Sequence, residues 1–543
     1  MKFRPSPLLH SPIRRSTRAR AVALPATDPL VFCTLSFGIA AAGLLLLAAP
    51  HARAASQTWD GGLDGTGTTL HTGPNWDGDA IPGSGDTASF GNLNGTGGNL
   101  ALTYESGFTG GGNGVSFNVL STHTGSISID PGTNATSLRI KDITLAAGAG
   151  SLTFGNGEGI MNITFGSGAT GFTSNTMVNN SAGATVTFRS DTRFGVGGGG
   201  AGVLRPISFE GEGNWQIDSV FKPNTNNAQG SFVVTKRGTG TLALNAVNTG
   251  ANSNGGGVGL HSLIIEQGTV LAGATGALGG NATTGAVTLG LAGANNVSLL
   301  NTGAFSHSNN ITVPTGVTGT VTIGGNHTTG MSLFTGNLAL GSNAVFTATG
   351  AGRTDFTTGV ISGAGNVTVT GGGTIGLAGV NTYTGTTTIE SGTLRATGNS
   401  SLGTSTAAIP LGTANTIANN LSATLRINNL TTISRDVIVG ASNAATSGTY
   451  TIDTDNGASA ATLTGNVTLN QNLTVTGATT GGLIINGNIT TGSAGSRTVS
   501  FTGGSNSNQR LEVTGAIGGG AGEISVQKSG STTLTFSGNS TYT

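Results

Sequence analysis

Short segments that alternate apolar and polar residues follow one another from about residue 115 onward. Each segment alternates an apolar residue with Thr, Ser or Asn and ends at Gly, Asn-Gly or Gly-Gly, as in residues 184–188, 319–323 and 461–469. A period of two with turn residues between the segments is typical of β-strands. No stretch after residue 54 sustains a helical period over ten residues, so the pattern predicts an all-β chain.

A four-residue motif opens many of these segments: Asn, an apolar residue, Thr or Ser, and a second apolar residue. It begins at Asn162, Asn296, Asn310, Asn366, Asn466 and Asn472. Asn tolerates turn conformations, and its amide bonds to neighbouring backbone or to a stacked Asn, so a stack of equivalent turns favours it. The alternative is that Asn, Thr and Val are simply frequent in this chain.

The composition fits either a disordered chain or a repetitive β-fold. Charged residues make up 8% of the chain and Gly supplies 96 residues, whereas globular domains average about 25% charged residues. Disordered chains have few β-branched residues and no periodicity. This chain instead has many β-branched residues and a clear period of two, so the pattern favours a repetitive β-fold.

Stacking of short strands explains how such a sequence forms a core. One rung of about 20 to 25 residues cannot bury an apolar face, but stacked rungs complete both the core and the backbone hydrogen bonds. The expected fold is an all-β, right-handed parallel β-helix. A tandem array of β-sandwiches is the alternative, and it would repeat core aromatics in units of about 100 residues. Trp215 is the only tryptophan beyond residue 115, which weakens that alternative.

Residues 1–54 have the parts of a secretory signal peptide. A basic stretch precedes an apolar run over residues 30–49, and Ala52 and Ala54 then form a small-x-small cleavage site. We expect cleavage after Ala54 and export through the inner membrane. An uncleaved membrane anchor is the alternative, because the apolar run approaches the about 20 residues that span a bilayer.

Removal of the leader changes the charge and the thiol content of the chain. Seven of the 22 Lys and Arg and one of the 22 Asp and Glu lie in residues 1–54, so the mature chain carries 15 basic and 21 acidic residues. Such a sparsely charged, acidic chain lacks the basic stripe that nucleic acid requires. The one cysteine, Cys33, also lies in the leader, so we expect no disulfide or thiol chemistry after cleavage.

Longer units repeat in the second half of the chain. Residues 361–384 correspond to residues 517–543, and a more diverged copy begins at Val234. The downstream half of the unit, residues 387–394, matches residues 263–271. The copy that begins at residue 517 stops in mid-unit at residue 543, so we expect the sequence to be a fragment of a longer protein.

The best copy, residues 371–403, resembles the autotransporter-associated β-strand repeat, which runs roughly Gly-x-Gly-x-Leu-x-Leu-x-Gly-x-Asn-x-Tyr-x-Gly-x-Thr-x-Ile, then Gly-x-Leu. The matching residues are Leu377, Asn381, Tyr383, Gly385, Thr387, Ile389, Gly392 and Leu394. The copy over residues 234–280 departs from the pattern, because it lacks the Tyr and is expanded over residues 251–259. Strong resemblance covers about a quarter of the chain.

We divide the chain into four expected regions: a signal peptide (1–54), an N-terminal cap with two tryptophans (55–115), a degenerate β-solenoid (116–233), and a β-solenoid with autotransporter-associated repeats (234–543). A cap would cover the first open rung, whose free edge otherwise promotes aggregation. Trp59 and Trp76 are expected to pack in this cap. Stacking of these rings on sugars is the alternative.

The resemblance also implies a function. It indicates a secreted or surface-displayed structural or adhesive passenger of a type V secretion (autotransporter) protein, found at the cell surface, in the outer membrane or outside the cell. Surface glycans or other cells are the expected partners, and a C-terminal β-barrel beyond residue 543 would connect the chain to the outer membrane. A fibre held by a sorting-type C-terminal anchor is an alternative.

The sequence offers few candidates for catalysis or for a cofactor, and we expect neither. It has no Gly-x-Ser-x-Gly, no Gly-Lys pair and no closely spaced histidines after residue 54. A β-helical polysaccharide lyase or glycosidase is the enzymatic alternative, and it would need clustered carboxylates with Arg or Lys. Asp453 and Asp455 would face the same side of a strand and are weak candidates for calcium. A solvated strand face is the preferred interpretation for them and for Glu210 and Glu212.

Overall fold

The computed structural model describes residues 55–92, 98–105, 108, 113–133, 137–157, 159–165, 175–196, 204–221, 231–248, 259–280, 285–442, 447–455, 457–477, 481–503 and 510–542. They all fall within one compact unit, Arg53–Thr543. The predicted cleavage residues Ala52 and Ala54 lie outside the described residues, so the signal peptide stays a prediction.

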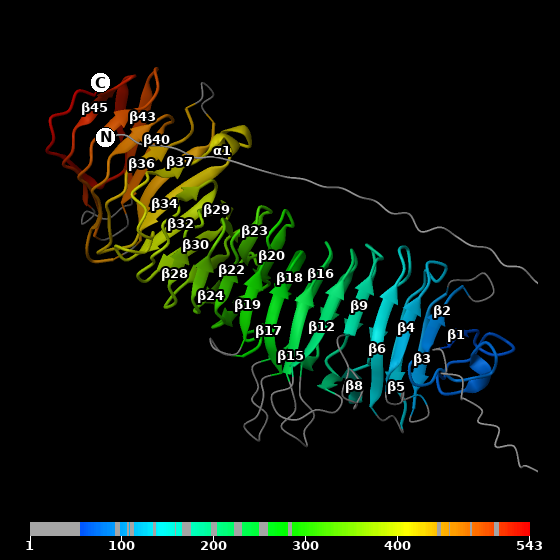
Figure 1. Ribbon diagram of the computed structural model, residues 1–543. Coiled ribbons are helices and arrows are strands. Elements are labelled where there is room, and N and C mark those ends of the chain that lie inside the picture. The colour runs from blue at the N-terminus through cyan, green and yellow to red at the C-terminus, as the bar shows by residue number, and fades with distance from the viewer. Residues whose placement is uncertain are drawn as a thin grey trace, which may run out of the picture. The chain divides into compact units, whose positions relative to one another are not determined.

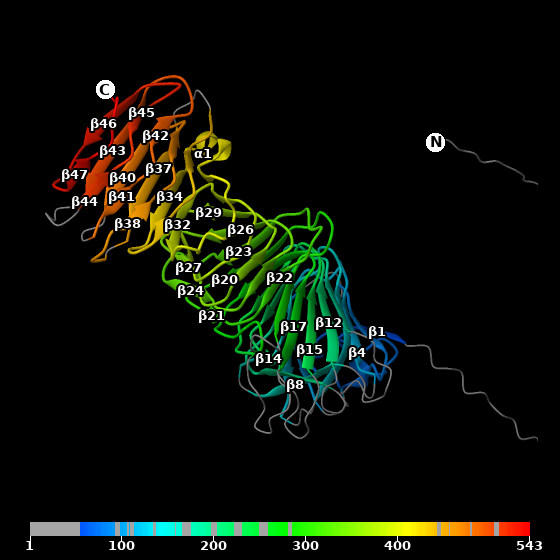
Figure 2. The same ribbon diagram turned by 60° about the vertical axis from the view of Figure 1, so that its left-hand side comes forward.

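The unit is a β-solenoid of about 15 turns, nearly all β and 2% helical, in which strands of successive turns pair in parallel. Figure 1 shows these strands stacked in chain order from β1 to β45, and Figure 2 shows the sheets from a second side. The predicted parallel β-helix is therefore confirmed as a fold, and its right-handedness stays a prediction.

The first sheet follows the order β1 (Ser56–Trp59), β2 (Thr87–Phe90), β4 (Val115–Val119), β6 (Leu138–Leu145), β9 (Asn175–Asn179), β12 (Leu204–Glu210), β15 (Ser231–Lys236), β17 (Leu260–Ile265), β19 (Ala286–Leu289), β22 (Ile311–Val313), β25 (Leu338–Leu340) and β28 (Ile361–Gly363). β8 (Met161–Phe165) pairs with β6, β11 (Thr192–Val196) with β8, and β14 (Val220–Phe221) with β11. Strands of the predicted cap and of the predicted solenoid thus share one sheet.

The second sheet contains β3 (Leu100–Tyr104), β5 (Ile127–Pro131), β7 (Leu152–Phe154), β10 (Thr185–Phe188), β13 (Asn214–Ile217), β16 (Thr241–Leu244), β18 (Gly268–Ala272), β20 (Val297–Asn301), β23 (Val321–Gly325), β26 (Ala344–Ala348), β29 (Val367–Gly371), β31 (Thr387–Ile389), β33 (Ile409–Leu411), β36 (Val437–Val439), β39 (Val467–Leu469), β42 (Ile489–Thr491) and β45 (Ile517–Gly520). It runs through almost the whole solenoid and gives it a continuous wall.

The third sheet contains β21 (Ser306–His307), β24 (Met331–Phe334), β27 (Arg353–Phe356), β30 (Thr374–Ala378), β32 (Gly392–Thr397), β34 (Ser422–Ile427), β37 (Thr449–Thr454), β40 (Leu473–Gly477), β43 (Arg497–Gly503) and β46 (Ile524–Lys528). The fourth contains β35 (Thr432–Ile433), β38 (Ala461–Leu463), β41 (Leu483–Ile485), β44 (Arg510–Val513) and β47 (Thr533–Phe536). The helices among the described residues are a 3-10 turn (Gly73–Asn75) and α1 (Ala414–Ala418).

One wall of the solenoid is interrupted. Up to β28, each third-sheet strand is followed along the chain by a first-sheet strand and then by a second-sheet strand. From β35 onward, a fourth-sheet strand stands in the place of the first-sheet strand. Between β28 and β35, two turns have no strand there. Residues 379–386 and 398–408 occupy the position instead, and we call them the strandless wall.

The length of a turn varies along the solenoid. Residues bonded across neighbouring turns lie 20 positions apart at Ile361 and Asn381, but 35 apart at Ile140 and Asn175. The expectation of 20 to 25 residues holds near the best repeat and is too short for the N-terminal half. The number of residues between paired strands therefore differs along the solenoid.

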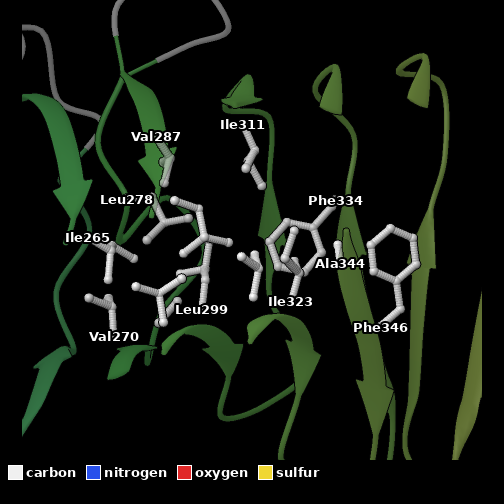
Figure 3. Packing of buried hydrophobic residues seen from close by; sticks show 14 of the residues in the cluster. Ile265, Val270, Leu278, Val287, Leu299, Ile311, Ile323, Phe334, Ala344 and Phe346 are labelled. Atoms are coloured by element: carbon white, nitrogen blue, oxygen red, sulfur yellow. The ribbon is translucent and has the colours of Figure 1, made fainter. Parts of the chain in front are cut away.

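The core consists of apolar side chains at alternate strand positions. In β26, Ala344, Phe346 and Ala348 are buried while the residues between them are partly exposed. Figure 3 shows how Val287, Leu299, Ile311 and Ile323 from different strands approach one another inside the solenoid. Burial of every second side chain on parallel strands is the structure that the period of two predicts.

Aromatic rings fill the N-terminal part of the core. Trp59 and Trp76 meet edge to face at 5.1 Å, and Phe154 stacks on Phe188 at 5.0 Å. Both tryptophans are almost fully buried, at 1% and 0% exposure. Their ring faces are therefore not accessible to a sugar, which removes that alternative.

Candidate functional site

The repeat residues turn inward at the boundary of the strandless wall. Leu377 on β30, Ile389 on β31 and Leu394 on β32 are fully buried in the core. Gly385 lies so close to the neighbouring turn that a Cβ would come within 2.1 Å of the Gly365 carbonyl oxygen. The apolar repeat positions therefore build the core, and Gly385 permits close stacking of the turns.

The side chain of Asn381 forms hydrogen bonds to the neighbouring turns where a strand backbone would otherwise form them. Its Oδ1 accepts the Ile361 N–H at 2.9 Å, and its Nδ2 donates to the Ser401 carbonyl at 2.7 Å. These partners belong to the turns on either side, and the Asn381 side chain is fully buried. One amide thus bridges three consecutive turns where the regular strand pairing is absent.

Tyr383 and Thr387 extend this network inward. The Tyr383 hydroxyl lies 2.8 Å from the Thr387 Oγ1, and burial raises the pKa of Tyr383. Arg435, two turns further along the chain, donates from Nη1 to the same Thr387 oxygen at 3.0 Å and to the Leu402 carbonyl at 3.2 Å. Its Nε donates to the Ala407 carbonyl at 2.7 Å. A buried guanidinium therefore supports the strandless wall.

A cavity of about 390 Å³ opens beside Arg435. It is lined by Asn399, Ser400, Leu402, Gly403, Thr404, Ser405, Thr406, Ile433, Ser434, Arg435 and Asp436. Most of the lining side chains carry a hydroxyl or an amide. Residues of the segment 398–408 line one side of the cavity. The cavity therefore lies between the end of the first sheet and the beginning of the fourth.

The outward Asn residues form ladders on the surface. Asn466 and Asn488 each accept, through Oδ1, a backbone N–H from the next turn, that of Asn488 at 3.0 Å and that of Ala516 at 2.9 Å. Motif residues with the same bond are Asn296, Asn310, Asn366, Asn466 and Asn472. In these five of the six predicted copies the motif marks stacked turns, so composition alone does not account for it, whereas Asn162 lies within β8.

A column of charged side chains crosses the third sheet. The strand register aligns Gly376, Arg395, Arg426 and Asp453 on consecutive turns. Arg426 donates to both carboxylate oxygens of Asp453, at 3.0 Å from Nε and 2.6 Å from Nη2, and Arg395 bonds Asp455. The positive charges of the two arginines are thus paired with aspartates of a neighbouring turn.

Asp453 lies on β37, and Asp455 directly follows that strand. Their side chains are 14% and 20% exposed, and Arg426 contacts both. Desolvation raises the pKa of Asp453, against the lowering effect of the Arg426 hydrogen bonds. Within the described residues, no three His, Cys, Asp or Glu side chains lie close enough together to hold a metal ion. The contacts assign these carboxylates to arginines, and Glu210 is likewise paired with Arg237 at 3.2 Å.

One contact has the form of a catalytic pair. His327 Nε2 lies 3.1 Å from the hydroxyl of Ser332, but that hydroxyl also lies 3.0 Å from the Thr354 hydroxyl. Ser332 is fully buried, and His327 Nδ1 faces the Thr329 carbonyl at 2.9 Å. Because a substrate cannot reach Ser332, the contact serves the packing between turns.

Sequence reasoning missed Arg435, although a signal was present. Arg435 falls on the inward phase of an alternating run, between the buried Ile433 and Val437. Arg497, also buried, shares this feature with Val499. A charged residue at an inward position of a strand pattern is the observation that could have identified both.

In the part of the chain that the structure describes, no helix is long and apolar enough to cross a membrane. Comparison of the chain with protein-family models, with curated proteins and with solved structures gives no match.

Proposed function

We propose that this chain is a secreted or surface-displayed passenger of a type V secretion (autotransporter) protein and acts as a structural or adhesive fibre. The β-solenoid is compatible with that role. Support comes from the leader sequence of residues 1–54 and from the repeat signature of residues 371–403. The described signature residues are used for stacking, which is what an extended fibre requires.

The observation that carries the proposal is the role of Asn381. A buried side chain that bonds to both neighbouring turns serves no purpose outside a stack. The same reasoning applies to Gly385, whose lack of a side chain lets two turns approach. The repeat therefore serves to join turns of the solenoid. Joining more turns gives a longer fibre with more exposed surface.

Localisation in the producing cell tests the proposal. Antibodies against the solenoid should label intact cells, external protease should remove the label, and the mature chain should begin at Ala55. A full-length chain that stays in the inner membrane and is protected in intact cells would contradict it. The reading frame beyond residue 543 separates the two anchoring routes: alternating strands of about ten residues indicate an outer-membrane barrel, and a sorting motif with an apolar helix indicates the other anchor.

The enzymatic alternative depends on the column of charges. Arg395, Arg426, Asp453 and Asp455 combine the residue types that polysaccharide lyases and glycosidases use. Incubation with a panel of acidic polysaccharides, followed by reducing-sugar and unsaturated-product assays, tests it. If the wild type forms product and Asp453→Asn does not, the protein is an enzyme and the proposal of a fibre is wrong.

A further inference from the structure

Several strands of the solenoid begin with a sequence that also accepts N-linked sugars. The three residues Asn, any residue except Pro, and Thr or Ser form the sequon at which asparagine is glycosylated in exported proteins. Such a match is frequent in a chain rich in Asn and Thr, so accessibility in the fold decides whether a copy can carry a sugar. Four sequon asparagines are exposed directly before a strand: Asn296, Asn466, Asn472 and Asn488.

The side-chain nitrogens of these four asparagines are available. In each residue Oδ1 accepts a backbone N–H of the next turn, as Asn466 accepts that of Asn488 at 3.0 Å. Within the described part of the chain, no hydrogen bond engages Nδ2 of any of the four. An asparagine that carries a sugar on Nδ2 keeps its carbonyl oxygen as an acceptor, so the bond between the turns remains possible.

The hydroxyl of the sequon lies on the same side of the chain as the amide. Residues two positions apart on a strand face the same side of a sheet. Val467 of β39 is fully buried, whereas Asn466 before it is exposed and Thr468 after it is partly exposed. Strand pairing places Thr468 beside Thr490, the hydroxyl residue of the sequon that begins at Asn488. The groups that define both sequons therefore lie on the outer side of the second sheet.

Another sequon shows the opposite arrangement. Asn179 begins the sequon of residues 179–181 and is 0% exposed. Its Nδ2 donates to the Ala184 carbonyl at 3.1 Å and to the Asn214 carbonyl at 3.0 Å. A sugar on this nitrogen would displace buried hydrogen bonds, which the fold cannot replace with water. The structure thus separates sequons that can be occupied from one that cannot.

We propose that Asn296, Asn466, Asn472 and Asn488 are acceptor sites for N-linked glycosylation by a separate glycosyltransferase. In this reaction Nδ2 forms a bond to C1 of a nucleotide-activated sugar and gives one proton to a base. The bond between C1 and the diphosphate breaks, and the nucleoside diphosphate leaves with the electron pair. Because the four asparagines are exposed, the sugars project into solvent and leave the core unchanged. The inference does not rest on surface display, since a chain retained in the cell can be glycosylated and an exported chain can lack sugar.

Mass spectrometry of the full chain, purified from the producing cell, tests the proposal. Peptides fragmented by a method that keeps sugars attached should show a sugar on the asparagine of the four exposed sequons and none on Asn179. Absence of sugar from all four asparagines would overturn the proposal. Attachment to the hydroxyl of Thr468 in place of Asn466, or a sugar on Asn179, would also overturn it.

Two variants of one sequon test whether the transferase recognises the hydroxyl. Thr468→Val keeps a β-branched side chain at an outward strand position and removes the hydroxyl. Asn466 should then lose its sugar, while Asn472 keeps its own as an internal control for folding and expression. Thr468→Ser retains the sequon, and Asn466 should stay modified. Modification of Asn466 that persists in Thr468→Val would overturn the assignment to the sequon.

Asn337 is the matched control for an accessible asparagine outside a sequon. It is exposed, and its Oδ1 accepts the Val360 N–H at 2.9 Å, as in the four proposed sites. The residue two positions after it is Ala339, which has no hydroxyl. Asn337 should therefore carry no sugar, and its modification to the same extent as Asn466 would contradict enzymatic recognition of the sequon.

Discussion

The guanidinium of Arg426 on β34 holds the carboxylate of Asp453 on β37 through two hydrogen bonds, although the residues are 27 positions apart in the chain. Parallel pairing of the two strands places them directly opposite each other. The Asp453 side chain is 14% exposed. The pair therefore joins two turns on the outer face of the third sheet, in the way that Asn381 joins turns inside the solenoid.

Removal of the Arg426 charge should destabilise the solenoid. Arg426→Met leaves Asp453 partly buried without a partner, and we expect a loss of about 1–3 kcal/mol in the free energy of unfolding. Denaturant unfolding, with hydrogen exchange at β34 and β37, measures it. Lys528→Met is the control, because Lys528 is exposed and, among the described residues, forms no ion pair, so its loss should change the stability by at most about 0.5 kcal/mol. Equal losses in the two variants would contradict the structural role of the Arg426 contact.

Calcium should not stabilise the chain at Asp453 and Asp455. Both carboxylates are bonded to arginines, which compete with a cation for the same oxygens. We expect the same Tm with calcium and with a chelator, both for the wild type and for Asp453→Ala/Asp455→Ala. A calcium-dependent rise of Tm in the wild type that disappears in the double variant would establish the metal site instead.

The stacking residues could be predicted from the sequence because they recur. Leu377, Ile389 and Leu394 follow the period of two, and the structure buries all three. The surface Asn residues were likewise expected at stacked turns, where they accept N–H groups from the next turn. Local rules of alternation and turn chemistry are sufficient for such positions.

The column of charges and the cavity could not be predicted in this way. Asn381 lies 20 residues from its partner Ile361, while Arg426 lies 27 residues from Asp453. With turns of unequal length, no fixed period indicates which residues become neighbours. The cavity also depends on where strands are absent, and short strands are easily confused with extended loops.

Loss of the Asn381 side chain should be costly. Asn381→Ala leaves the Ile361 N–H and the Ser401 carbonyl buried without partners, and we expect a loss of about 2–6 kcal/mol, because each of the two unsatisfied groups costs about 1–3 kcal/mol. Asn343→Ala is the control: Asn343 is exposed and accepts one N–H, that of Asn366. Hydrogen exchange at Ile361 should accelerate only in Asn381→Ala. Similar stability of the two variants would count against the bridging role.

A methyl group at Gly385 should separate two turns. The Cβ of Gly385→Ala would lie 2.1 Å from the Gly365 carbonyl oxygen, a backbone atom that cannot move aside as a side chain can. We expect a clear drop in Tm together with faster hydrogen exchange in β29 and β31. In Gly183→Ala, nothing lies within 4 Å of the added atom, and Tm should stay near that of the wild type. An unchanged Tm in Gly385→Ala would show that the turns do not stack this closely.

The buried His307 should make stability depend on pH under acidic conditions. Burial lowers the pKa of His307 from 6.5 to about 4. Between these values the unfolded chain binds more protons than the folded chain, so stability falls as the pH is lowered from about 6.5 to about 4 and this contribution levels off below. The full change from this one group is about 3 kcal/mol.

Substitution of His307 by a residue that does not titrate isolates this contribution. His307→Gln keeps an amide that can bond to Asn301, the partner that His307 Nε2 contacts at 2.7 Å. We expect the stability of this variant, measured by denaturant unfolding at a series of pH values, to fall less steeply than that of the wild type between pH 6.5 and pH 4. His261→Gln, on the partly exposed face of β17, is the control for loss of a histidine. A slope in His307→Gln equal to that of the wild type would mean that the acid sensitivity arises elsewhere in the solenoid.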